Sequence, residues 1–125
     1  MNYTILNQYD IKFVNVNGRK KVSFKGNELI ERYIYTFKDV TTLNELIADV
    51  NLAINGQIED TENYLYESNP PVADVARDDG GAYIFADLMA NGVMIYENEI
   101  INDSITIPLE DFKEILLSWK EFLQS

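Results

Sequence analysis

An apolar stripe near the C-terminal end of the chain most strongly limits the folds that this sequence can adopt. Its members recur every three or four residues after Pro108, which is the spacing of one face of an α-helix. Pro108 suits a first helical turn, and Glu110 and Asp111 complement the positive end of the helix dipole. The sequence therefore predicts a helix over about 109–123 with one side buried. The stripe consists of Phe112, Ile115, Leu116, Trp119, Phe122 and Leu123.

A second amphipathic helix is predicted over about 42–55. Thr42 and Glu45 have the spacing of a capping box, in which each side chain accepts a hydrogen bond from the other residue's amide. Asn55-Gly56 is typical of a left-handed helix end. The apolar residues between these signals fall on one helical face: Leu43, Leu46, Ile47, Val50 and Ile54.

Two β-hairpins are also predicted. Asn17-Gly18 interrupts the run 12–24 and is the favoured pair for a type I′ turn, because both positions need positive φ. A second hairpin is predicted from 82–89 and 93–100 around Ala90-Asn91-Gly92, and a further strand over 104–107.

Residues 28–37 fit two structures, because their apolar residues have helical spacing while 33–37 is a strong β run by residue type. We favour a strand over 31–38. These elements predict an α+β fold: an antiparallel sheet of about five or six strands with both amphipathic helices packed on one face. At 125 residues, we expect 1–125 to be a single domain. The other face of the sheet is then polar, covered or used for binding.

The absence of histidine and cysteine limits the chemistry open to the chain. Ser–His and Cys–His nucleophiles and thiolate metal sites are impossible without them. The sequence also lacks the glycine-rich phosphate-binding motifs, and Asp78-Asp79-Gly80-Gly81 lacks the closing glutamate of a calcium loop. We therefore expect no enzymatic activity, no cofactor and no metal.

The start of the sequence does not resemble a signal peptide, and no apolar run approaches the roughly 20 residues of a membrane span. The lack of cysteine also leans toward a reducing compartment. We expect a cytoplasmic protein that does not bind membranes.

The net charge of −11 is unevenly distributed along the sequence. Residues 1–44 carry seven basic and four acidic side chains, whereas residues 57–103 carry eleven carboxylates and only Arg77. An acidic field repels nucleic acid and attracts a basic partner, chiefly by raising the association rate. We therefore expect a protein partner and no direct nucleic-acid binding.

Tyrosines are interleaved with the carboxylates of this acidic segment. Tyrosine buries a large area and keeps a polar tip, which suits protein interfaces. Carboxylates beside it can pair with the lysines and arginines of a basic cleft. The predicted partner-binding residues are Glu59, Asp60, Glu62, Tyr64, Tyr66, Asp74, Asp78 and Asp79.

The end of this small, acidic, cysteine-free chain resembles bacterial immunity proteins of contact-dependent growth-inhibition and other polymorphic toxin systems. The resemblance lies near the C-terminal end, in Ile105-Thr106-Ile107-Pro108-Leu109-Glu110-Asp111-Phe112-Lys113 and then Leu116-Leu117-Ser118-Trp119-Lys120-Glu121-Phe122-Leu123. The resemblance implies a cytoplasmic protein that binds its cognate toxin domain, often a nuclease, and blocks the active site. It assigns no site residue, because the matching segment is structural.

We expect such an inhibitor to be a monomer or a weak dimer. Two other functions stay open on the sequence alone. One is a DNA-mimic or anti-restriction inhibitor, which would spread its acidic residues along an elongated surface. The other is a small ligand-binding or enzymatic α+β domain with a deep pocket.

Overall fold

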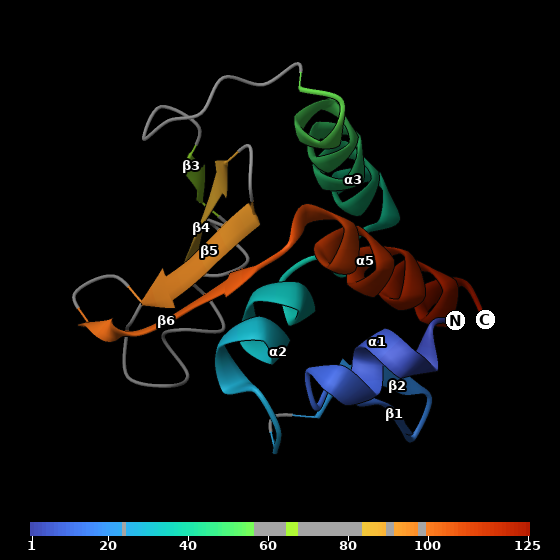
Figure 1. Cartoon of the computed structure of the whole chain (residues 1–125). Helices are drawn as coiled ribbons and strands as arrows, with labels where there is room; N and C mark the ends of the chain where they lie inside the picture. The colour runs from blue at the N-terminus through green and yellow to red at the C-terminus, as the bar shows by residue number, and fades with distance from the viewer. Residues whose placement is uncertain (24, 57–64, 68–83, 90–91, 98–99) are drawn as a thin grey trace.

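The predicted C-terminal stripe lies at the centre of the core in the computed structural model, which describes residues 1–23, 25–56, 65–67, 84–89, 92–97 and 100–125. It belongs to helix α5 (Leu109–Gln124), which runs through the middle of the molecule in Figure 1. Phe112 and Trp119 are fully buried. The Trp119 indole also donates a hydrogen bond to the Phe37 carbonyl at 2.8 Å, so the ring is fixed by a polar contact as well as by packing.

The second predicted helix is confirmed as α3 (Val40–Ile54), which packs against α5. It begins two residues earlier than predicted, and the Thr42–Glu45 capping box is not its cap. The side chain of Asp39 caps the helix instead, accepting a hydrogen bond from the Thr41 amide at 3.1 Å. Gly56 follows the helix with a φ of 71°, as the predicted left-handed end requires.

The strand favoured over 31–38 is wrong, because Glu28–Tyr35 form helix α2. The Asn27 side chain caps this helix by accepting a hydrogen bond from the Ile30 amide. The apolar residues Ile30, Tyr33 and Ile34, which have helical spacing, are all fully buried, and Glu31 and Arg32 between them are buried as well. Burial of this face outweighs the β-propensity of the individual residues, which depends on context.

Four strands form one antiparallel sheet in the order β3-β4-β5-β6. They are β3 (Leu65–Glu67), β4 (Ile84–Met89), β5 (Gly92–Glu97) and β6 (Ile100–Ile107). The pairing of β4 with β5 confirms the second predicted hairpin, and the strand expected over 104–107 is the end of the longer β6.

The first predicted hairpin is confirmed as β1 (Phe13–Val16) and β2 (Arg19–Val22), with φ of 54° at Asn17 and 84° at Gly18. It forms a separate two-stranded sheet, so the expectation of one sheet of five or six strands is wrong for the described residues. The hairpin packs on α5 instead, where the ring of Phe13 lies 5.1 Å from that of Trp119 and 5.5 Å from that of Phe122. The α+β class is confirmed.

A short helix that the sequence analysis did not predict, α1 (Tyr3–Gln8), begins the fold. The Asn2 side chain caps it through the Ile5 amide, and the Asn2 amide donates to the Ser118 hydroxyl at 3.1 Å. These contacts place α1 beside α5.

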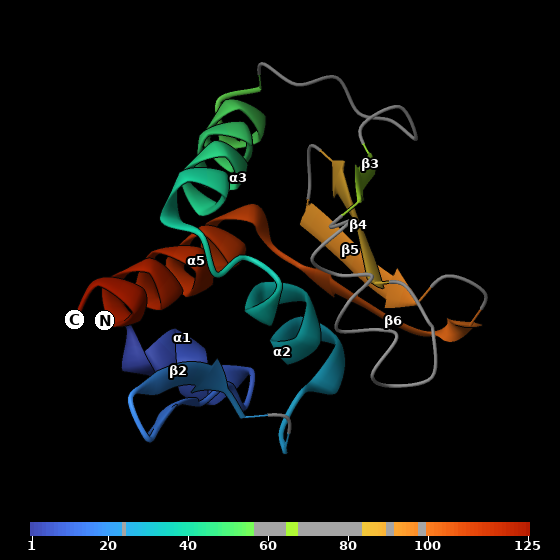
Figure 2. The same cartoon turned by 180° about the vertical axis from the view of Figure 1, so that it is seen from behind.

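The helices lie on one side of the four-stranded sheet (Figures 1 and 2). Helix α2 contacts β4, β5 and β6, whereas α3 and α5 pack chiefly against each other, α3 also contacting β4 and α5 contacting β5. Helix α2, whose residues were predicted to form a strand, therefore joins α3 and α5 on the same side of the sheet. None of the described helices has the length and apolar character that a membrane crossing requires.

Candidate functional site

Seven of the eight predicted partner-binding residues lie outside the described residues. The eighth, Tyr66, belongs to β3, and its backbone pairs with that of Ala86. Ala86 is buried under the helices, so Tyr66 has a register position on the helix-covered face of the sheet. The seven others are Glu59, Asp60, Glu62, Tyr64, Asp74, Asp78 and Asp79.

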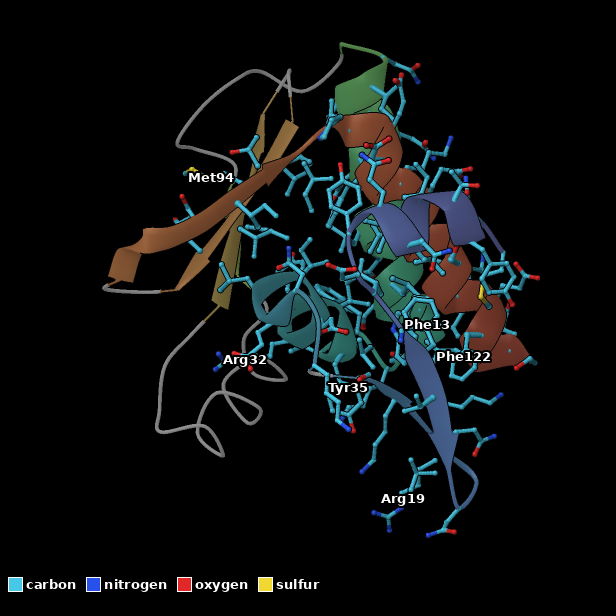
Figure 3. All side chains as sticks on the ribbon, turned by 60° about the horizontal axis from the view of Figure 1, so that its bottom comes forward. Phe13, Arg19, Arg32, Tyr35, Met94 and Phe122 are labelled. Carbon is cyan, nitrogen blue, oxygen red and sulfur yellow. The ribbon has the colours of Figure 1, made fainter. Side chains whose placement is uncertain are left out.

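The strands β5 and β6 present two different faces. Val93 and Ile95 are buried, whereas Met94 and Tyr96, which alternate with them, are partly exposed. Because successive strand residues point to opposite faces, Met94 and Tyr96 lie on the face away from the helices. Figure 3 shows Met94 on that side of the sheet.

We call this second face the outer sheet face and define it by Met94, Tyr96, Ser104 and Thr106. Ser104 and Thr106 are exposed and belong to β6, and Thr106 pairs with Met94. None of the described helices packs on this face. It therefore combines partly exposed apolar groups with exposed hydroxyl groups.

Carboxylate residues of the acidic segment occupy register positions of the same face. Asp87 pairs with Met94, and Glu67 pairs with Phe85, which in turn pairs with Tyr96. All eight predicted partner-binding residues precede this hairpin in the sequence. The alternation of residues 84–88 and 93–96 was the signal that could have extended the predicted interface onto the strands.

A second candidate site is a polar pocket where three segments meet: the connection between α1 and β1, the connection between β2 and α2, and the first turns of α2. The pocket has a volume of about 320 Å³. The chain segments cross so closely here that a Cβ atom on Gly26 would lie 1.9 Å from the Asp10 carbonyl oxygen. The lining residues are Asp10, Lys12, Ser23, Lys25, Gly26 and Glu31.

Glu31 is the buried group of this polar pocket, with 0% of its surface exposed. Its Oε1 accepts a hydrogen bond from the Gly26 amide at 3.0 Å, whereas Oε2 has no partner with hydrogen-bond geometry among the described residues. Burial raises the pKa of Glu31 to about 7, and the charges of Glu28 and Asp10 add to this. The Gly26 and Lys12 amides act in the opposite direction, because they stabilise the carboxylate.

In the described part of the chain, no three acidic, histidine or cysteine side chains are grouped as metal ligands. The lining of the polar pocket consists of hydrogen-bonding and charged groups.

Family models, curated proteins and solved structures yield no match to this chain.

Proposed function

We propose that this chain is an immunity protein that binds a cognate basic toxin domain, with a nuclease as the expected toxin, and blocks its active site in the cytoplasm. The observation that carries the proposal is the concentration of eleven carboxylates and a single arginine in residues 57–103. A nuclease must hold phosphate groups, so its cleft is positively charged. A surface rich in carboxylates complements such a cleft and is itself repelled by nucleic acid.

The outer sheet face supports the proposal by offering contact area on residues that belong to the acidic segment or directly follow it in sequence. The thioether of Met94 adapts to irregular surfaces, and the ring of Tyr96 supplies a rigid apolar contact. Ser104 and Thr106 add exposed hydroxyl groups at the edge strand. Interfaces commonly combine such apolar anchors with polar neighbours.

Two basic residues of the N-terminal part are engaged within the helical side of the molecule. The Lys20 ammonium donates to the Leu123 carbonyl at 3.1 Å and to the Ser125 carbonyl, so it complements the C-terminal end of α5. The Lys38 ammonium lies 4.1 Å from the centre of the Tyr35 ring. Two of the seven basic side chains of residues 1–44 therefore have partners outside residues 57–103.

The first test uses the product of the gene upstream of this one. That protein is expressed in bacteria with and without this chain, and growth and binding are measured. We expect growth to stop with the upstream protein alone and to recover when this chain is present. An upstream product that is harmless, or that does not bind at low ionic strength, would contradict the proposal.

A second test places positive charge on the outer sheet face. We expect Met94→Lys and Thr106→Lys each to weaken toxin binding about tenfold or more, which corresponds to about 1.4 kcal/mol. Gln8→Lys adds the same charge at an exposed position of α1 and should change affinity less than about twofold. Equal affinities for all three variants would exclude the outer sheet face from the interface.

A third test addresses the acidic segment. We expect Asp78→Asn combined with Asp79→Asn to slow association by several fold, most strongly at low salt. Glu45→Gln combined with Glu110→Gln removes the same net charge from exposed positions on α3 and α5. If both pairs slow association equally, only the total charge matters and the predicted site is wrong.

A further inference from the structure

The hairpin β1–β2 has one face turned toward the core and one face turned away from it. Phe13 and its cross-strand partner Val22 lie on the inner face, because Phe13 packs on Trp119 and Val22 is buried. The ammonium group of Lys20 also reaches inward, to the Leu123 carbonyl. Successive strand residues alternate between faces and cross-strand partners share a face, so the residues between these lie on the opposite side. We call this side the outer hairpin face and define it by Val14, Val16, Arg19 and Lys21.

The outer hairpin face carries a row of valines beside a row of basic side chains. Val14 pairs with Lys21, and Val16 pairs with Arg19. Val16 is 46% exposed, and Figure 3 shows Arg19 at the far end of the hairpin, away from the helices. Cross-strand partners on one face lie about 5 Å apart, so the two rows form one continuous surface that is apolar on one side and basic on the other.

The charge of this hairpin is opposite in sign to that of the whole chain. Residues 12–25 hold five of the ten basic side chains and no acidic one, although the net charge of the chain is −11. Among the residues that the structure describes, no carboxylate forms an ion pair with Arg19 or Lys21. These cations therefore remain available to an acidic partner.

We propose that the outer hairpin face docks an acidic amphipathic helix of another protein, in which a row of carboxylates runs beside a row of apolar side chains. The apolar row of this helix covers Val14 and Val16, and its carboxylates pair with Arg19 and Lys21. The spacing fits a helix, because helix residues four apart are separated by about 6 Å along the axis and alternate strand residues by about 6.7 Å. The arginine adds a planar fork that binds a carboxylate through two hydrogen bonds.

Other anionic partners fit this surface less well. A nucleic acid or an anionic membrane presents many negative charges, so the remaining acidic charge of the chain repels it. Its phosphate groups also make no use of the valine row. The toxin domain of the proposed function is basic and does not complement this face either. The inference therefore does not depend on the proposed function, and each can fail without the other.

The test is a titration of the full chain at low ionic strength, followed by the amide chemical shifts of the hairpin in two-dimensional NMR spectra. The probe is a synthetic helical peptide of leucine, glutamate and alanine, with leucines every three or four residues and a row of glutamates beside them. Two matched peptides replace either every glutamate by glutamine or every leucine by alanine. We expect saturable shifts at the outer hairpin face with a Kd of about 0.2 mM or tighter, and binding about fivefold or more weaker for each matched peptide.

Variants then assign the two rows. Arg19→Gln combined with Lys21→Gln should weaken binding about tenfold or more, and Val16→Ser about threefold. Lys38→Gln combined with Lys113→Gln removes the same charge outside this face and should change affinity less than about twofold. All these positions are exposed or partly exposed, so the variants are expected to keep the fold.

Three results would overturn the inference. One is the absence of saturable shifts with the acidic peptide up to about 2 mM, well above the expected Kd. Another is an affinity that neither the Arg19 and Lys21 double variant nor Val16→Ser changes. The third is binding of polyuridylate RNA or of phosphatidylglycerol vesicles at the same face as tightly as the peptide, which would assign the face to a phosphate-bearing partner.

Discussion

Glu31 connects three segments of the chain through a single carboxyl group. Glu31 itself belongs to α2, and its Oε1 accepts a hydrogen bond from the Gly26 amide. The Lys12 amide also stabilises the charged form of the carboxyl group. Glutamate is rarely fully buried, and nothing in its sequence context distinguishes it from the exposed Glu28 three residues earlier. Its role could be recognised only once the fold had brought the two connections together.

The raised pKa of Glu31 predicts that this residue makes the protein less stable as the pH rises. The folded state binds the proton more tightly than the unfolded state, because the pKa is about 7 when folded and 4.5 when unfolded. Its contribution is fully present below pH 4.5, falls as the pH rises toward 7 and then levels off. Between pH 5 and pH 8, we expect the free energy of unfolding to fall by on the order of 2 kcal/mol more in the native protein than in Glu31→Gln. Urea unfolding at both pH values measures this, with Glu45→Gln as the control, and an unchanged pH dependence in Glu31→Gln would contradict it.

Tyr9 provides a second prediction for a single residue. Its hydroxyl donates to Asp111 Oδ2 at 2.7 Å, which joins α1 to the first turn of α5. We expect Tyr9→Phe to lower the free energy of unfolding by about 1 kcal/mol at pH 7. Tyr3→Phe is the matched control on the same helix, because Tyr3 is 65% exposed, and it should have almost no effect.

The same hydrogen bond has a pH limit. Burial, the hydrogen bond and the charge of Asp111 together raise the pKa of Tyr9 from 10.0 to about 12. The stabilisation is therefore present below pH 10 and lost as the pH rises toward 12. We expect the free energies of unfolding of the native protein and of Tyr9→Phe to converge between pH 10 and pH 12, as measured by denaturant unfolding. If the difference between these two free energies stays constant over this range, the hydrogen bond is not formed.

At the scale of elements, sequence signals succeeded where local chemistry decides the structure. The spacing of apolar residues in α5 and the Asn17-Gly18 turn each depend on a few neighbouring residues, and both were predicted. Residues 28–37 were misassigned because two local signals conflict there and burial against the core decides between them. The separation of the first hairpin from the main sheet depends on contacts with Trp119 and Phe122, which no local pattern indicates.

Two glycines in the connections give a prediction at this scale. Gly18 has a φ of 84° and open space around it, so Gly18→Ala should destabilise the protein by about 1 kcal/mol through backbone strain alone. Gly26 touches the Asp10 backbone, so Gly26→Ala forces the two connections apart and should cost about 2 kcal/mol or more. Thermal unfolding measures which variant is destabilised more. If Gly26→Ala lowers the unfolding temperature less than Gly18→Ala, the two connections do not cross as closely as described.

At the scale of the whole molecule, α5 joins parts that are far apart in sequence. It contacts α1, α3 and β5, and the ring of Phe13 from the first hairpin packs against its aromatic residues. Of the predicted partner site, only Tyr66 belongs to the described part of the chain, so that site stays a prediction. The polar pocket could not be predicted, since its lining combines residues from α1–β1, β2–α2 and α2 that share no sequence pattern.

This central position of α5 predicts cooperative unfolding. Trp119 is the only tryptophan of the chain and contacts the first hairpin, so its fluorescence reports on the docking of that hairpin. We expect fluorescence and far-ultraviolet circular dichroism to give the same urea midpoint. Phe13→Ala should lower both midpoints together, by about 2 kcal/mol in free energy, since Phe13 is partly buried. Separate midpoints would show that the hairpin unfolds on its own.

The contacts between α1 and α5 also bear on synthesis. The Asn2 amide bonds to a side chain 116 residues later, and the Tyr9 hydroxyl to one 102 residues later. A ribosome releases α1 and the first hairpin long before it releases the helix against which they pack. These first segments therefore reach their native positions only after α5 has also emerged from the ribosome.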